Sequence, residues 1–288
     1  MFKTLMHWIG GLLALVGVGF VVERLWTHAE QLELAAMGWG TWFVLSFIFF
    51  IYGSSNTLLA LSWRELLSHF TLPVPRMWSI WAWGVSQIAK YVPGNIFHLA
   101  GRQALGVSAG YSHRPLAVSA IWELCILAVM ALPFAVLLLP LVAGSVRPIG
   151  ALVSFIFVAV ISLLAAKVVF GQHVSRSMFF VLSYLVISAL VFVSIVQLNS
   201  SALAFDKITL LSGAFVLAWL VGLVTPGAPA GIGVRELVLM FLLKDQLPQA
   251  ELITGVVLGR LVTAAGDGLF FVATSIYGRR FFSVAAIK

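Results

Sequence analysis

Charged residues and cysteine are scarce in this sequence. Only 9% of its 288 residues are charged, and its single cysteine, Cys125, lies in an apolar run and cannot form an intrachain disulfide. No Cys and His cluster has metal-ligand spacing, so we expect neither zinc nor redox chemistry, and no cofactor. The chain has ten Asp and Glu. None of its loops combines paired carboxylates, a His-activated nucleophile or a metal-carboxylate group, so an enzyme is not expected.

Apolar residues, by contrast, make up 61% of the chain, and the mean hydropathy is +1.08. Ordinary soluble domains are roughly 45–50% apolar and about 25% charged. A helix that spans a bilayer needs about 20 mostly apolar residues. The sequence therefore predicts an all-α integral membrane protein, a single polytopic domain over residues 1–288 in the plasma (cytoplasmic or inner) membrane.

Six apolar runs are long enough to cross a bilayer. They lie at about 5–25, 41–61, 116–140, 149–168, 178–198 and 252–277. The first run follows Lys3 like a signal peptide, but Glu23, Glu30 and Glu33 follow it in place of a small-residue cleavage site. We interpret it as a retained first helix.

Two further apolar regions, 78–110 and 208–243, are each interrupted in the middle. The interruptions are Tyr91-Val92-Pro93-Gly94-Asn95 and Thr225-Pro226-Gly227-Ala228-Pro229-Ala230-Gly231. Proline removes a backbone donor and clashes with the preceding turn. Each region is therefore predicted to be a broken or re-entrant helical hairpin. If both regions are instead counted as spans, the chain has eight membrane spans.

Basic residues near helix ends set the predicted orientation. Most Lys and Arg lie in short loops, so we attribute the net charge of +7 and the pI near 9.9 to topology and lipid contact, and do not expect nucleic acid as a partner. Both termini are then cytoplasmic, provided that 78–110 enters and leaves from the cytoplasm and 208–243 from outside. Arg147 is the exception to this pattern.

The two interrupted regions resemble each other. Placing Pro93-Gly94 over Pro226-Gly227 aligns Arg102 with Arg235 and Gln103 with Glu236, at an offset of 133 residues. Such a pattern in segments that enter from opposite faces is typical of an inverted-repeat transporter, here with halves at about 41–140 and 178–277. The alternative is coincidence, because Pro-Gly pairs are common.

The chemistry of the two breaks suits an anion such as a phosphate. A broken helix exposes backbone N–H groups and a positive dipole end, and glycine lets the backbone approach a ligand closely. Arginine adds bidentate contacts to phosphate oxygens. The candidate residues at the breaks are Pro93, Gly94, Asn95, Pro226, Gly227, Gly231 and Gly233, with Lys90, Arg102, Gln103, Arg235 and Glu236 beside them.

A structural interpretation of the same charges stays open. Lys90 and Arg102 could snorkel to head groups, and Arg235 could pair with Glu236 or another acid to hold the fold. Glu123, Arg260 and Asp267 also lie within predicted spans. They could form a buried network with Arg235 or take part in substrate or proton handling.

The residues at these positions resemble a known family. The segment from Thr225 to Glu236 is similar to the Pro-rich, Gly-x-Gly-x-Arg-Glu signature of the lysylphosphatidylglycerol synthase transmembrane-region family. Lys90-Tyr-Val-Pro-Gly94 resembles its Lys-Tyr-x-Pro-Gly element, and Gly259-Arg260-Leu261 with Thr263 its late Arg-containing helix. Glu123 stands where members often carry an acid. The resemblance covers about residues 5–280, and Ala228-Pro229-Ala230 departs from it, because members usually have more glycine there.

That resemblance implies a flippase-like membrane domain, as in the multiple peptide resistance factors, where it moves aminoacylated phosphatidylglycerol between leaflets. Those proteins add a soluble aminoacyl-transfer domain. Because this sequence ends at Lys288, after the last predicted helix, synthesis of lysyl-lipid is not expected.

The function predicted is therefore a stand-alone lipid translocase for a phospholipid or a polyprenyl-phosphate-linked sugar. A membrane-embedded lipid-modifying enzyme and a non-transporting partner of a lipid or polysaccharide synthesis complex are the alternatives. The expected partners are membrane lipids. A homo-oligomer, or an association with enzymes of lipid or glycan synthesis, is compatible with the sequence.

Overall fold

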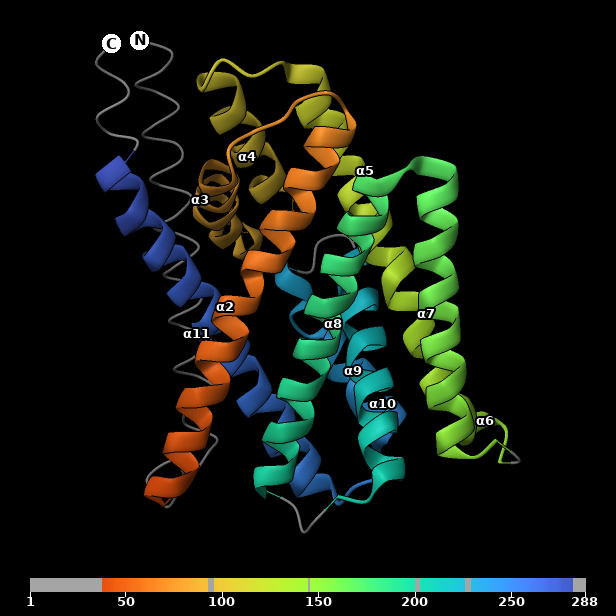
Figure 1. Ribbon diagram of the computed structural model, residues 1–288. Coiled ribbons are helices and arrows are strands. Elements are labelled where there is room, and N and C mark those ends of the chain that lie inside the picture. The colour runs from red at the N-terminus through yellow and green to blue at the C-terminus, as the bar shows by residue number, and fades with distance from the viewer. Residues whose placement is uncertain (1–37, 93–95, 145, 200–202, 226–228, 282–288) are drawn as a thin grey trace.

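The computed structural model describes residues 38–92, 96–144, 146–199, 203–225 and 229–281, and in these ranges the chain is helical with no strand (Figure 1). The predicted first span, 5–25, lies outside the described residues. So do Pro93, Gly94, Asn95, Pro226 and Gly227. The prediction of an all-α membrane protein is confirmed.

Six helices in the described part are long and apolar enough to cross a membrane. They are α2 (Trp39–His69), α5 (His113–Ala131) continued through η3 (Leu132–Leu138) and α6 (Leu139–Val142), α7 (Pro148–Phe170), α8 (Gln172–Asn199), α9 (Phe205–Val224) and α11 (Gln249–Phe281). Five of them contain the apolar runs predicted between 41 and 277. The sixth, α9, was assigned to one arm of an interrupted region, yet its 20 residues extend about 30 Å, enough for the hydrocarbon core.

Both regions predicted to be interrupted are folded as two helices packed side by side. The first comprises α3 (Arg76–Gln87), the short 3-10 helix η2 (Ile88–Tyr91) and α4 (Phe97–Ser108). The second comprises α9, η4 (Pro229–Gly231) and α10 (Val234–Leu243). Figure 1 shows α3 and α4 in the upper half of the view and α9 and α10 in the lower half.

The two interruptions meet inside the protein. η2 contacts η4 directly. Ile88 and Tyr91 of η2 form a small apolar cluster with Ala230 and Ile232 from the other interruption. Segments more than 130 residues apart in the sequence are thus brought together at one place.

Close packing of α2 against α11 fixes the scaffold around this place. A Cβ atom built on Gly266 would lie 3.2 Å from the backbone nitrogen of Gly53 and 2.7 Å from Cδ1 of Tyr52. Small residues of this kind let helix backbones approach closely in membrane proteins. The contact positions Asp267, the next residue of α11, beside the polar face of α2.

The helix α7 faces outward. Its buried residues are Ala151, Phe155, Ala159 and Ala166, whereas side chains such as Val168 and Phe157 are exposed. An apolar surface of this extent suits contact with lipid. The polar residues of the fold are therefore concentrated elsewhere, around the two interruptions.

Candidate functional site

A cavity of about 80 Å³ lies where the two interruptions meet. Several helices contribute its polar lining: α2, α3, η2, α4, α5, α8, α10 and α11. The polar side chains are Tyr52, Gln87, Lys90, Tyr91, His98, Glu123, Tyr184, Arg235, Arg260, Thr263 and Asp267. Most are buried, so their charges and hydrogen bonds have to be satisfied within the protein or by a ligand.

The first ion pair joins Arg102 to Glu123. Nη1 and Nη2 of Arg102 lie 3.2 and 2.5 Å from the two carboxylate oxygens of Glu123. The guanidinium also lies over the ring of Trp63, 4.7 Å from its centroid, and Trp83 Nε1 donates to Glu123 at 3.4 Å. Arg102 is 2% exposed and does not line the cavity. Its terminal donors are occupied by Glu123, a buried structural pair that differs from the snorkelling to head groups given as the alternative for Arg102.

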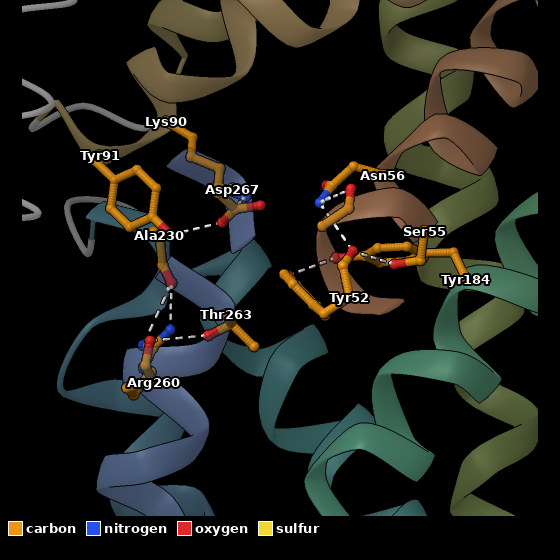
Figure 2. A network of polar contacts seen from close by, with 11 residues as sticks. Tyr52, Ser55, Asn56, Lys90, Tyr91, Tyr184, Ala230, Arg260, Thr263 and Asp267 are labelled. Atoms are coloured by element: carbon orange, nitrogen blue, oxygen red, sulfur yellow. Dashed lines mark hydrogen bonds and ion pairs between the residues drawn. The ribbon is translucent and has the colours of Figure 1, made fainter. Parts of the chain in front are cut away.

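The second ion pair joins Lys90 to Asp267. Lys90 Nζ lies 2.8 Å from Oδ2 of Asp267, and the hydroxyl of Tyr91 donates to the same oxygen at 2.6 Å. Figure 2 shows both side chains descending from η2 toward Asp267 on α11. The pair thereby attaches the first interruption to the last helix.

The third ion pair joins Arg260 of α11 to Glu236 of α10. Arg260 Nε donates to Oε1 of Glu236, and its Nη1 and Nη2 each lie 3.4 Å from the carbonyl oxygen of Ala230 (Figure 2). Glu236 therefore pairs with Arg260 and not with its sequence neighbour Arg235.

Arg235 is the exception among these basic residues. It is 8% exposed, and within the described residues its guanidinium makes no hydrogen bond or ion pair. It lies over the ring of Phe215, 5.3 Å from the centroid. This contact provides weak electrostatic attraction but no charge neutralisation.

The aliphatic part of Arg235 is held between two glycines. A Cβ atom on Gly222 of α9 would lie 2.5 Å from Cγ of Arg235, and one on Gly231 would lie 3.0 Å from its Cδ. Gly231 has a φ of 70° and the preceding Ala230 a φ of 49°. This left-handed backbone turns the chain into α10, whose first turn carries Arg235.

A charge count follows from these contacts. Four Lys and Arg side chains and three carboxylates lie in the cavity wall or pair directly with it. Among the described residues they form the three ion pairs Lys90–Asp267, Arg102–Glu123 and Arg260–Glu236. Arg235 belongs to none of these pairs. Among these Lys, Arg, Asp and Glu side chains of the described residues, 4 − 3 leaves one positive charge, which one bound anion would balance.

Two predicted site residues take other places. Gln103, in the middle of α4, donates from Nε2 to the carbonyl oxygen of His113 at 3.0 Å, and it does not line the cavity. Gly233 precedes the first residue of α10 with a φ of 84° and is exposed. The first helical bond runs from Leu237 N–H to the Gly233 carbonyl at 3.1 Å, so earlier N–H groups of that turn have no partner inside the helix.

The sequence interpretation missed the polar residues of α2 and α8. Tyr52 and Tyr184 lie in the cavity wall with their hydroxyl oxygens 3.0 Å apart. Asn56 is fully buried one turn after Tyr52. The spacing of Tyr52 and Asn56 within the apolar run 41–61 was the available signal, because polar residues inside a span usually face the bundle interior.

Comparison with protein-family models, with curated proteins and with solved structures gave no match to this chain.

Proposed function

We propose that this protein is a lipid translocase, in which the cavity binds the phosphate of a lipid head group while the acyl chains remain in the bilayer. The observation that carries the proposal is the guanidinium of Arg235, which lines the cavity, is 8% exposed and has no hydrogen-bond or ion-pair partner among the described residues. An unpaired charge inside a membrane protein is costly and is retained where it has a role. A phosphate oxygen is a suitable partner, since arginine forms strong, charge-assisted and often bidentate bonds with phosphate.

The walls of the cavity support a ligand that is part polar and part apolar. Leu124 of α5 lines the cavity and is 36% exposed. Leu127 and Leu223 also line it. A lipid can therefore place its head group beside Arg235 with its chains directed outward past apolar side chains, as in other sites that combine apolar walls with a few polar groups.

The two hairpins support alternating exposure of this site. Under the proposal, the pairs α3–α4 and α9–α10 are inserted from opposite faces of the bilayer, and their interruptions meet inside it. Transporters built from broken helices place their substrate site at such a junction. Movement of one hairpin would open the cavity to one leaflet, and movement of the other hairpin would open it to the opposite leaflet.

Replacement of Arg235 tests the proposal. In proteoliposomes that contain fluorescent phosphatidylglycerol, Arg235→Gln should slow lipid movement between leaflets by about 10- to 100-fold, because a hydrogen bond to a charged group contributes roughly 1.5–3 kcal/mol. Arg114→Gln is the matched control, since Arg114 is exposed at the start of α5. Movement at the wild-type rate by a stably inserted Arg235→Gln protein would refute the proposal.

A further inference from the structure

Of the three buried carboxylate or amide oxygen atoms without a hydrogen-bond donor in the described part of the chain, two lie on the facing helices α2 and α11. They are Oδ1 of Asn56, on α2, and Oδ1 of Asp267, on α11. Their residues are 0% and 3% exposed. A buried acceptor without a donor costs roughly 1–3 kcal/mol. Two such acceptors at one place indicate that a donor belongs there in some state of the protein.

The orientation of the Asn56 amide is set by its own helix. Nδ2 donates to the carbonyl oxygens of Tyr52 and Gly53, at 3.3 and 3.4 Å. The flipped amide would place an oxygen against these carbonyl oxygens, which is unfavourable because neither can donate. Oδ1 therefore faces away from the α2 backbone and can only accept.

Asp267 is satisfied at one oxygen only. Lys90 and Tyr91 both contact Oδ2, which leaves Oδ1 unused. Figure 2 shows Asp267 and Asn56 on facing sides of the space between α11 and α2, with a carboxylate oxygen directed toward Asn56. The two helices are close here, because Gly266 packs on Gly53. A proton on Oδ1 of Asp267 would be a donor directed at Oδ1 of Asn56.

We propose that Asp267 is a proton-binding site coupled to the anion site, so that one proton accompanies each lipid head group. This inference rests on the proposed function. Lys90 lines the same cavity as Arg235 and can pair either with Asp267 or with an incoming phosphate. When Lys90 turns to the phosphate, Asp267 is a buried carboxylate without its cation, a state that burial strongly disfavours. Asp267 then binds one proton from water, and Asn56 accepts the O–H.

The charges balance in this step. One negative phosphate and one proton enter together, so the net charge of the loaded cavity equals that of the empty one, and no bond other than the O–H of Asp267 forms. Arg235 supplies the positive charge opposite the phosphate, and the proton replaces the cation that Asp267 loses when Lys90 turns away, so Asp267 is not left as an isolated buried charge.

The other groups around Asp267 do not replace it as the proton acceptor. Glu123, the other acid of the cavity lining, is held by both terminal nitrogens of Arg102. Glu236, whose Oε2 has no partner among the described residues, keeps its ion pair with Arg260 when Lys90 leaves Asp267. The remaining titratable or charged groups that face the cavity from the surrounding elements are Tyr52, Lys90, Tyr91, His98, Tyr184, Arg235 and Arg260.

Proton uptake on lipid binding tests the inference. Short-chain phosphatidylglycerol is added to the purified protein in weakly buffered detergent solution with a pH-indicator dye, and binding is measured in parallel by calorimetry. The wild-type protein should take up about one proton per lipid bound, and an infrared difference spectrum should show a new carboxylic-acid carbonyl band. Asp267→Asn should bind lipid with neither signal, whereas Asp245→Asn, at an exposed position before α11, should behave as wild type.

Asn56 provides an independent variant. Asn56→Leu removes the acceptor for the proposed O–H and should reduce proton uptake several-fold at the same lipid occupancy. Ser55→Ala is its control, because Ser55 Oγ bonds only to the Tyr52 carbonyl, at 2.7 Å, in the same turn. If the wild-type protein binds lipid without proton uptake, or Asp267→Asn takes up protons like wild type, the inference is overturned and the proposed function stands. Absence of lipid binding to the wild-type protein would overturn both.

Discussion

Glu123→Leu leaves the guanidinium of Arg102 without the carboxylate that it contacts at 3.2 and 2.5 Å. At a charge separation of about 4 Å and an effective dielectric constant of about 20, the attraction lost is about 4 kcal/mol. Breaking a buried pair by removing one partner typically costs about 3–5 kcal/mol, since the remaining charge is buried alone. We therefore expect the free energy of unfolding of Glu123→Leu to fall by about that amount, and Arg102→Met to have a similar effect.

The double variant distinguishes a structural pair from a substrate ligand. Replacing a whole buried pair by apolar residues of similar volume is often neutral or stabilising, so Arg102→Met with Glu123→Leu should recover most of the loss. Denaturant titration in detergent, followed by tryptophan fluorescence, gives the four values of the double-mutant cycle. Losses that simply add would refute the assignment of these residues as a coupled pair. A stable double variant that no longer moves lipid would show instead that Arg102 acts on the substrate.

Two further replacements test the surroundings of Arg235. Gly222→Ala would place a Cβ atom 2.5 Å from Cγ of Arg235 and displace its side chain. Lipid movement should slow severalfold, and the free energy of unfolding should fall by about 1–3 kcal/mol. Gly150→Ala, where a Cβ meets nothing within 4 Å, should change neither lipid movement nor stability. Glu236→Gln removes the carboxylate from Arg260 and adds one positive charge to the site. It should tighten the binding of short-chain phosphatidylglycerol measured by calorimetry and lower stability, and weaker binding would contradict the charge count.

The fold was predictable where the signal is local. Apolar length located five of the six candidate spans, and Pro with Gly located both interruptions. Apolar length does not reveal how far each arm of an interrupted region extends, so α9 was not recognised as long enough to cross. The arms differ in another respect that the alignment of the two Pro-Gly pairs concealed. Arg102 is the sixth residue of α4, whereas Arg235 is the second residue of α10.

The pairing of charges was not predictable, because it depends on the direction of each side chain. Arg235 and Glu236 are consecutive residues of α10, and consecutive helical residues do not face each other. Glu236 consequently reaches Arg260 on α11, while the stem of Arg235 packs on Gly222 of α9. For the same reason Gln103, next to Arg102, bonds to the backbone of the following helix and stays out of the cavity. The set of charged residues was visible in the sequence, but it did not reveal that Arg235 has no ion-pair partner among the described residues.

The ion pairs made by α11 have a consequence for biosynthesis. Asp267 and Arg260 are the partners of Lys90 and Glu236, which belong to the two hairpins, and ribosomes make α11 after both of them. During synthesis the hairpins therefore carry unmatched charges in the membrane, and these are neutralised only when the last described helix inserts. Unpaired charges within the membrane are costly. We therefore expect a chain truncated before α11 to remain incompletely folded and to be degraded by membrane proteases. Completion of the chain, and not the insertion of any single hairpin, would then commit this protein to its folded form.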